Sequence, residues 1–291
     1  MKTFLVLGGD SRSTATAQQL SALGFTVRCY ACHTPDETTD AVLYSKSLQE
    51  ALIGADYILL PLPCSIGEGL LNAPFSEEKI HLLELAEQLT PTQLVFAGKT
   101  DKIFSAALDM HGISHFDYAE REEFTVLNAI PTAEGALEIT LREMPSTING
   151  STVLITGFGR IAKILAHMLQ GLGAKVTVAA RKHSDLAWMK AYGYKTLSIH
   201  NLKEHVKHFD VIYNTVPHMI FDREILSLVN KNALLIDLAS RPGGFNFESA
   251  EKLGLSCIHA LSLPGKVAPL TAGRIIGDTV LNILQEWEVK A

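Results

Sequence analysis

The feature that most constrains the fold is an apolar segment near the middle of the chain that ends in two closely spaced glycines. Residues Thr152–Thr156 are typical of a buried strand, and the helix-like pattern that follows opens with Gly-Phe-Gly-Arg-Ile-Ala. In this register Gly157 permits a tight turn, Gly159 admits a ligand close to the backbone, and Ala162 lets the helix pack closely on the sheet. The amide groups and the dipole of such a helix stabilise a pyrophosphate. We therefore predict a Rossmann fold that binds a dinucleotide through Gly157, Phe158, Gly159, Arg160 and Ile161.

The alternation of strand and helix continues through residues 146–267 with short connections. Such alternation predicts parallel strands joined by right-handed crossovers. These residues are therefore expected to form one NAD(P)-binding Rossmann domain. Its strands are expected at Thr152–Thr156, Lys175–Ala179, Lys195–Ser198, Val211–Asn214, Ala233–Leu238 and Ser256–His259.

Residues 1–145 show a second array of the same kind, which we expect to form a flavodoxin- or Rossmann-like substrate domain. The turn residues of Pro145–Gly150 mark its end. A helical pattern from Glu120 to Arg142 is expected to be interrupted at Pro131, because proline removes a backbone hydrogen bond. The last helical pattern has no strand to follow, so residues 268–291 are expected to return and complete the first domain. The predicted fold class is α/β, with two doubly wound parallel-sheet domains and a deep cleft between them.

Composition restricts the partners. The formal net charge of −6 argues against nucleic acid, and no stretch is long and apolar enough to span a bilayer. The four cysteines, Cys29, Cys32, Cys64 and Cys257, show neither a disulfide framework nor zinc spacing. We therefore expect no metal and a reduced cytoplasmic environment, with the C-x-x-C at Cys29 and Cys32 structural rather than redox-active.

The residues after the second strand of the Rossmann domain bear on the choice of cofactor. An enzyme that uses NAD usually has an acid there to bind the ribose 2′-hydroxyl, whereas this chain reads Val-Ala-Ala-Arg-Lys at 178–182. Arg181 is suited to pair with a 2′-phosphate, assisted by Lys182 or His183. We predict NADP, with NAD as the alternative; the competing interpretation is that Arg181 only begins a solvent-facing helix.

Two further strands end at the edge where open α/β sheets bind ligands. The residues after the fourth strand are expected beneath the nicotinamide ribose, and those after the fifth beside the ring. They are Thr215, Val216, Pro217, Asp237, Ala239 and Ser240.

Several strings of the sequence resemble the family of dipicolinate synthase A-subunits. They are Gly8-Gly9-Asp10 at the start, Glu120–Ala136, Asp237–Gly244 and His259–Gly273. The run Pro-Gly-Lys-Val-Ala-Pro-Leu-Thr-Ala-Gly within the last is the most specific, and the resemblance covers essentially the whole chain. A looser likeness extends to 2-hydroxyacid, alanine and adenosylhomocysteine-type two-domain enzymes.

The resemblance implies oxidation of dihydro- or hydroxytetrahydrodipicolinate by NAD(P)+, on the lysine-pathway branch that makes dipicolinate in the mother cell of a sporulating bacterium. It also implies a flavoprotein-like partner, the B-subunit of dipicolinate synthase, and we expect a homo-oligomer. Two alternatives remain open. One is an NADP-dependent dehydrogenase of another small keto or hydroxy acid, and the other is a non-catalytic subunit that senses NADPH.

A flat dicarboxylate needs cationic or hydroxyl anchors on two sides. Loss of a hydride from its ring is accompanied by loss of a proton, and a base with a near-neutral pKa accepts that proton best. For each candidate a structural role is the competing interpretation. The candidate substrate anchors are Arg12, Lys99, Thr132, Arg241 and Lys266, Lys99 being assigned to catalysis as well. The candidate bases are His218 first, then Glu134 and His259.

Overall fold

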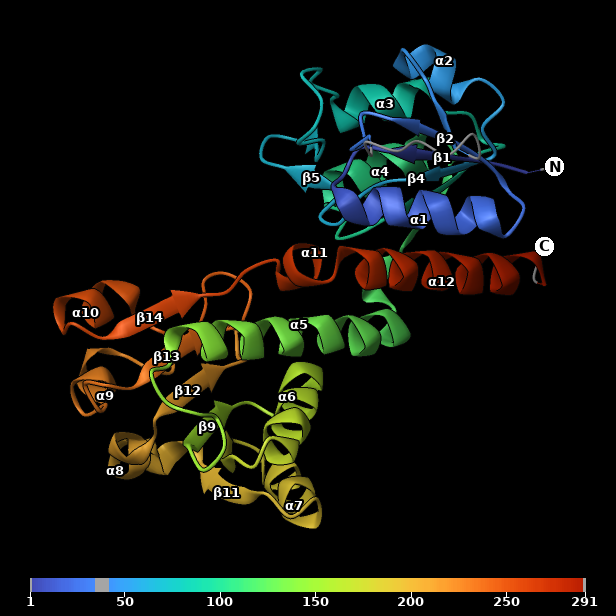
Figure 1. Cartoon of the computed structure of the whole chain (residues 1–291). Helices are drawn as coiled ribbons and strands as arrows, with labels where there is room; N and C mark the ends of the chain where they lie inside the picture. Colours follow the sequence, from blue (N-terminus) through green and yellow to red (C-terminus); the bar gives the residue numbers. More distant parts are fainter. Residues whose placement is uncertain (1, 35–41, 290–291) are drawn as a thin grey trace. The chain divides into compact units, whose positions relative to one another are not determined.

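The computed structural model describes residues 2–34 and 42–289, which divide into two compact units (Figure 1). One unit contains Met1–Asn128 and Ala268–Ala291, and the other contains Ala129–Val267. The domain boundary expected near residue 145 stays a prediction; the division into compact units falls inside helix α5 (Glu122–Glu143). The physical reason is that Ala133, Ala136 and Ile139, in the second half of α5, pack in the core of the second unit.

The first unit is built on a six-stranded parallel sheet in the order β3-β2-β1-β4-β7-β8. Sequence order thus runs outward from β1 in both directions, which is the doubly wound topology. Its strands are β1 (Thr3–Leu7), β2 (Thr26–Tyr30), β3 (Val42–Tyr44), β4 (Tyr57–Leu59), β7 (Leu94–Ala97) and β8 (Ser114–Asp117). A small antiparallel pair, β5 (Ser65–Ile66) and β6 (Leu70–Leu71), lies outside this sheet.

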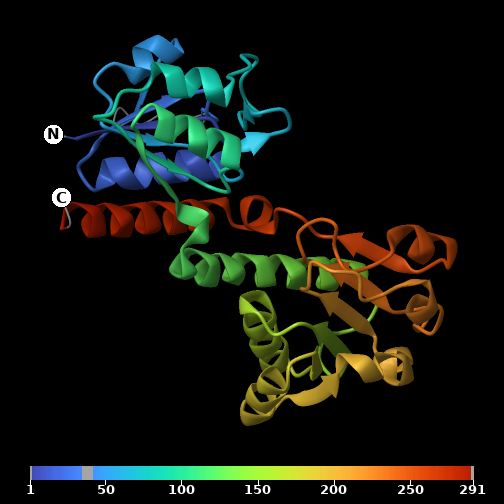
Figure 2. The same cartoon turned by 180° about the vertical axis from the view of Figure 1, so that it is seen from behind.

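Alternate residues of β1 serve two separate cores, because successive side chains of a strand point to opposite faces. Leu5 and Leu7 join the core beneath three helices, whereas Phe4 and Val6 join the core beneath two others. The three helices are α2 (Leu48–Leu52), α3 (Leu82–Gln88) and α4 (Lys102–Met110), and the two are α1 (Ser11–Ala22) and α12 (Pro269–Glu288). Figure 2 shows α1 and α12 side by side.

Helix α12 belongs to the first unit because small residues let it approach α1 closely. A Cβ placed at Gly273 would lie 2.4 Å from the carbonyl oxygen of Arg12 and 2.6 Å from the Cβ of Ala15. The Thr16 hydroxyl donates to the carbonyl of Gly273 at 2.8 Å. The C-terminal segment therefore completes the first unit through helix packing and not through an added strand.

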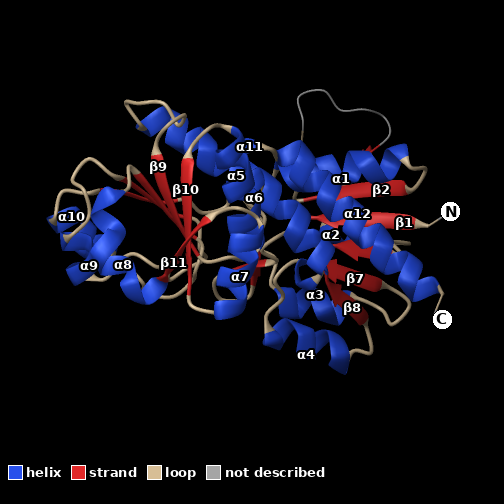
Figure 3. Ribbon diagram, turned by 90° about the horizontal axis from the view of Figure 1, so that it is seen from below, coloured by secondary structure: helices blue, strands red, loops and turns tan. Residues whose placement is uncertain are grey.

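The second unit repeats the topology with a parallel sheet in the order β11-β10-β9-β12-β13-β14. Figure 3 draws the strands of both units in red. Two six-stranded parallel sheets confirm the predicted fold class; the cleft expected between the domains stays a prediction. The strands are β9 (Thr152–Thr156), β10 (Lys175–Ala180), β11 (Lys195–Ser198), β12 (Val211–Asn214), β13 (Leu234–Asp237) and β14 (Ser256–His259).

Each face of the second sheet is covered by its own helices. On one face of the sheet lie α5, α6 (Arg160–Gly171), α7 (His183–Ala191) and α11 (Leu263–Val267). On the other face lie α8 (Leu202–His205), the short helical turn η3 (Val206–His208), α9 (Arg223–Ser227) and α10 (Phe247–Lys252). A buried hydrogen bond between the hydroxyls of Thr140 and Tyr213 ties α5 to β12.

Two local expectations differ from the structure. Helix α5 continues through Pro131 without the expected interruption, since proline removes only one backbone hydrogen bond of a helix of 22 residues. Strand β3 and helix α2 were not expected, because each is too short to show a clear periodicity. Within residues 2–34 and 42–289, no helix is both long enough and apolar enough to cross a membrane.

Candidate functional site

The turn after β9 has the geometry that the glycine pattern predicts. Gly157 adopts a φ of +97°, and its amide donates to the carbonyl of Ala179 on β10 at 2.8 Å. A Cβ at this position would lie 2.4 Å from the Thr215 hydroxyl oxygen and 2.9 Å from a methyl group of Val216. Only glycine fits here, so the turn after β9 and the loop after β12 are packed against each other.

Gly159 has the opposite environment. A Cβ placed there would meet no atom within 4 Å, and helix α6 begins directly after it without a side-chain cap. A ligand can therefore approach the backbone at Gly159, and the first-turn amides of a helix that begins there can donate to a phosphate. Arg160 is exposed, Ile161 is half-buried and Phe158 is buried. The residues present thus fit the pyrophosphate of a nicotinamide dinucleotide.

Asp237 and Asn214 fasten the loops that follow β12 and β13. Both side chains are completely buried, and the Asn214 amide donates to Asp237 Oδ1 at 2.8 Å. The other carboxylate oxygen of Asp237 accepts the amide of Gly244 at 2.7 Å, and Asn214 Oδ1 accepts the hydroxyl of Thr156 at 2.8 Å. With its carboxylate enclosed in this way, Asp237 positions the two loops, and its expected contact with the cofactor stays a prediction.

The loops held by this pair carry the other residues expected at the nicotinamide. Pro217, His218, Ser240 and Arg241 are exposed at the carboxyl edge of the sheet, where β12 and β13 end. The backbone amide of His218 donates to the carbonyl of Val216 at 2.8 Å, which turns the chain back at this point. The structure therefore brings the two predicted loops to one edge, beside the Gly157 turn.

His259 is the more tightly held of the two candidate histidines of the second unit. Its Nε2 lies 3.1 Å from the carbonyl oxygen of Ala239, and its ring stacks on Phe247 with centroids 5.0 Å apart. His218 has no side-chain hydrogen bond within the described residues, so its ring is available to a ligand.

Arg181, Lys182 and His183 follow β10 directly and all three are exposed. Arg181 and Lys182 form no ion pair in the part of the chain that the structure describes. The first acid after the strand is Asp185, in the first turn of α7. The end of β10 thus presents cations where an NAD enzyme has a carboxylate.

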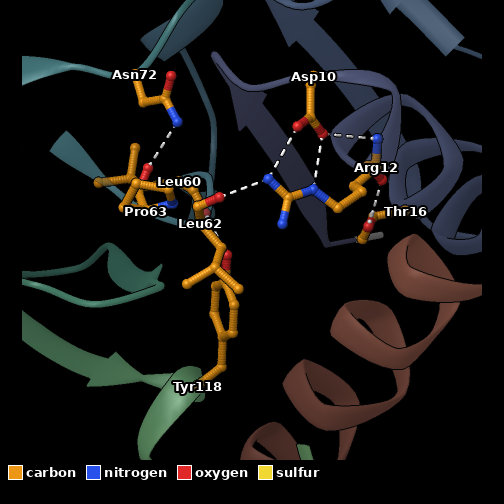
Figure 4. A network of polar contacts seen from close by, with 8 residues as sticks. All are labelled: Asp10, Arg12, Thr16, Leu60, Leu62, Pro63, Asn72 and Tyr118. Atoms are coloured by element: carbon orange, nitrogen blue, oxygen red, sulfur yellow. Dashed lines mark hydrogen bonds and ion pairs between the residues drawn. The ribbon is translucent and has the colours of Figure 1, made fainter. Parts of the chain in front are cut away.

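In the first unit, Arg12 is held by a polar network at the end of β1 (Figure 4). Its guanidinium donates to both oxygens of Asp10 at 2.8 Å and to the carbonyl of Leu62 at 2.6 Å, and the residue is only 9% exposed. Burial alone would raise the pKa of Asp10, but the hydrogen bonds and charge of Arg12 outweigh it and lower that pKa. Arg12 therefore has a structural role as the anchor of the 61–63 segment, and its expected contact with a substrate stays a prediction.

Lys99 follows β7 in a left-handed conformation, with a φ of +54°. Its backbone amide donates to Asp117 at 3.0 Å while its side chain is exposed. Gly98 before it is packed against Tyr118, whose hydroxyl donates to the carbonyl of Leu60 at 3.1 Å. Lys99 thus has a fixed backbone and an exposed side chain at the carboxyl edge of the first sheet.

The remaining candidates of the second unit lie on α5 and α11. A Cβ at Gly135 would lie 3.0 Å from the Cβ of Leu263, so these two helices pack closely. Thr132 is buried, whereas Glu134 on α5 and Lys266 on α11 are exposed. Asn214 is a residue that the sequence did not single out, although a polar residue at the end of the apolar strand Val211–Asn214 is a usable signal.

The fold and the site define a dehydrogenase-like protein with a nicotinamide-dinucleotide-binding domain. Residues 3–119 match the model of the N-terminal domain of the dipicolinate synthase A-subunit, and residues 132–242 match the NAD-binding domain of D-isomer-specific 2-hydroxyacid dehydrogenases. The chain belongs to the family of dipicolinate synthase A-subunits. It is 35% identical to the dipicolinate synthase A-subunit of Bacillus subtilis over 236 residues, which cover 81% of this chain and 80% of that protein.

Solved structures agree with this assignment. A dipicolinate synthase A-subunit from Bacillus halodurans has a TM-score of 0.88 and 30% identity, with 97% of each chain covered. The same subunit from Bacillus subtilis has a TM-score of 0.89 and 30% identity, with 100% of this chain and 98% of that chain covered. An L-alanine dehydrogenase with 14% identity and a TM-score of 0.63 shares the fold alone.

Proposed function

We propose that this chain is an oxidoreductase subunit that forms dipicolinate with NADP+ as the hydride acceptor. The observation that carries the proposal is the open turn at Gly159 in a chain that matches the dipicolinate synthase A-subunit family along its length. The substrate is dihydrodipicolinate or its hydrated form, hydroxytetrahydrodipicolinate. The cell is the mother cell of a sporulating bacterium, and the reaction takes place in its cytoplasm.

The net reaction removes a hydride and a proton from dihydrodipicolinate and leaves the aromatic dipicolinate ring. A nicotinamide cofactor held at the turn of Gly157 and Gly159 would supply the hydride acceptor. Within the second unit, the exposed Arg241 and Lys266 and the buried Thr132 are the groups that we assign to the substrate carboxylates. The ring of His218 accepts the proton, because it is exposed beside the loop that packs on the cofactor turn; Glu134 is the alternative base.

The family name implies a second, B-type subunit, and we assign to that partner any flavin-dependent or dehydration chemistry. Within the first unit, Lys99 is our candidate for contact with the substrate, since its amino group is exposed while its backbone is fixed by Asp117. The chain is proposed to work as a homo-oligomer together with the B-subunit.

The test is formation of dipicolinate, followed by its ultraviolet absorbance. Enzymatically generated hydroxytetrahydrodipicolinate and NADP+ are incubated with this chain, with the B-subunit, and with both. Dipicolinate and NADPH should appear together, and only in mixtures that contain this chain. If cofactor binds but no dipicolinate forms in any mixture, the chain instead senses NADPH or oxidises another small acid, and turnover of pyruvate- or glyoxylate-like acids separates those two cases.

The cofactor preference is tested separately with Arg181→Ala. Because a charge-assisted pair with a 2′-phosphate is lost, we expect NADPH to bind about tenfold more weakly or worse, with NADH unaffected. Lys190→Ala removes an exposed cation from the same segment and serves as the matched control. Equal affinity of the wild-type chain for NADH and NADPH would overturn the preference for NADP.

A further inference from the structure

The second unit contains a cavity at the opposite edge of its sheet from the candidate cofactor site. The cavity measures about 490 Å³ and lies where β9, β10 and β11 begin. Its lining includes Thr152, Thr177, Lys175 and Lys195 from the strands and His205 and His208 from the segment after them. The Gly157 turn and the loop after β12 follow the strand ends at the other edge, so this cavity does not belong to the dinucleotide site.

The strand register explains how the polar residues of the cavity come together. Lys175 is aligned with Thr152 on β9, and Thr177 is aligned with Lys195 on β11. Aligned residues of neighbouring strands share a face, and residues two apart on one strand do so as well. The two lysines and two threonines therefore form one patch on a single face of the sheet. That same face is covered by α8 and η3, which carry the two histidines.

The charge of the cavity differs from that of the chain as a whole. The chain carries a net charge of −6, yet no described residue of the lining has a carboxylate side chain. No ion pair within residues 2–34 and 42–289 engages Lys175, Lys195, His205 or His208. The carboxylate of Asp210 is bonded to the lining, but its Oδ2 already accepts the amide and the hydroxyl of Thr152 at 2.7 Å each.

Thr177 is the most informative side chain of the cavity. It is only 6% exposed, and its hydroxyl has no hydrogen-bond partner within the described residues. The hydroxyl oxygen is accessible from the cavity, so it is available to bond to a ligand there. Apolar side chains, among them Leu197 and Phe209, form another part of the wall, and Gln170, Tyr194 and Thr196 also belong to it.

We propose that this cavity binds a small organic anion that carries a carboxylate or phosphate group on an apolar body. Lys175 and Lys195 bind the anionic group, and the imidazoles of His205 and His208 donate further hydrogen bonds. The Thr177 hydroxyl donates to the same group, while the body of the ligand packs against Leu197 and Phe209. A volume of about 490 Å³ lies within the range of about 300–1,000 Å³ that is typical of small-molecule sites. The proposal does not depend on the reaction proposed above.

Isothermal titration calorimetry on the full chain tests this proposal. The probes are pyridine-2,6-dicarboxylate, phenyl phosphate and inorganic phosphate, each titrated with saturating NADPH present. The variant is Lys175→Ala with Lys195→Ala. The matched control is Lys190→Ala with Lys207→Ala, which removes two exposed cations of the same unit that do not line the cavity. Thr177→Val removes the hydroxyl at nearly constant shape.

At least one aromatic anion should bind, and the lysine variant should weaken it about tenfold or more, whereas the control should change its affinity less than about twofold. Which of the two aromatic probes binds shows whether the site selects a carboxylate or a phosphate. Thr177→Val should weaken binding several-fold, and it decides the outcome if the lysine variant fails to fold. Equal loss in the control, equally tight inorganic phosphate, or no binding by any probe would overturn the proposal. Binding that survives the lysine and threonine changes would overturn it too, because the probe would then occupy another site, such as the candidate active site.

Discussion

Replacing Asp237 by Asn tests whether one buried carboxylate organises the candidate cofactor site. The two side chains have the same shape, but an amide has one oxygen instead of two. Asp237 Oδ1 accepts from Asn214 Nδ2 and the Ala239 amide, and Oδ2 accepts from the amides of Gly244 and Phe245. In either orientation, the new NH2 group must therefore face two N–H donors.

The expected loss of stability follows from these four hydrogen bonds. A buried donor left without an acceptor costs about 1–3 kcal/mol, so two donors cost about 2–6 kcal/mol. Removal of a buried charge offsets part of this cost. We expect Asp237→Asn to lower the free energy of unfolding of the second unit by about 3 kcal/mol. Cofactor binding should weaken as well, because the same carboxylate holds the loop after β13.

The chain offers a way to follow the second unit alone. It has two tryptophans, of which Trp188 lies in the second unit and Trp287 in the first. In a Trp287→Phe background, urea unfolding followed by Trp188 fluorescence reports on the second unit. Asp210→Asn is the control, since this exposed carboxylate is at the same sheet and uses a single oxygen, Oδ2, for its bonds to Thr152. It should cost less than about 1 kcal/mol, and equal effects of the two substitutions would refute the reasoning.

Three further predictions concern the glycine turn, the first unit and the cysteines. Gly157→Ala should destabilise the chain by about 1–3 kcal/mol, because its φ is +97° and the added Cβ would lie 2.4 Å from a hydroxyl. Gly159→Ala should leave the melting temperature nearly unchanged but weaken NADPH binding about tenfold. Wild-type affinity of the Gly159→Ala variant would contradict the assigned site. Arg12 lowers the pKa of Asp10 below its ordinary value of 3.8, so Asp10 contributes stability at neutral pH that is lost as the pH falls through the lowered pKa. The destabilisation caused by Asp10→Asn, measured by urea unfolding, should therefore shrink between about pH 5 and pH 2. A difference in stability that does not change with pH would count against this prediction. Burial raises the pKa of Cys64 to about 12, so this thiol should react with a disulfide reagent only after the protein unfolds. The labelled residue is located by mass spectrometry. Fast labelling of Cys64 in the native protein would show that the thiol is not buried.

Local sequence patterns were sufficient for the second unit. Each of its six strands lies within a residue or two of its predicted position. The four inner strands are buried and largely apolar, and the edge strands β11 and β14 lie between clear helix signals. The first unit was less regular. Its edge strand Val42–Tyr44 has only three residues, too few for a clear sequence pattern. It is defined as a strand by its pairing with β2.

The candidate site divides in a similar way. The roles of Gly157 and Gly159 follow from their spacing, since the turn and the helix start are local structures. The role of Asp237 did not follow, because whether a carboxylate faces a ligand or its own backbone depends on residues such as Asn214 and Gly244 that fold around it. The same holds for Arg12, whose partner Asp10 is local but whose burial against Leu62 is not.

The sequence by itself determined the fold class, the dinucleotide turn and the cationic end of β10, because each depends on residues close together in the chain. The sequence also predicted that residues 268–291 return to the first domain. Only the tertiary structure decided that α1 is the helix on which α12 packs, that Asp237 is enclosed, and that Lys175 and Lys195 share a cavity with His205 and His208. Those arrangements arise from strand register and from the close approach of glycines to distant backbone, and both join residues that no local pattern connects.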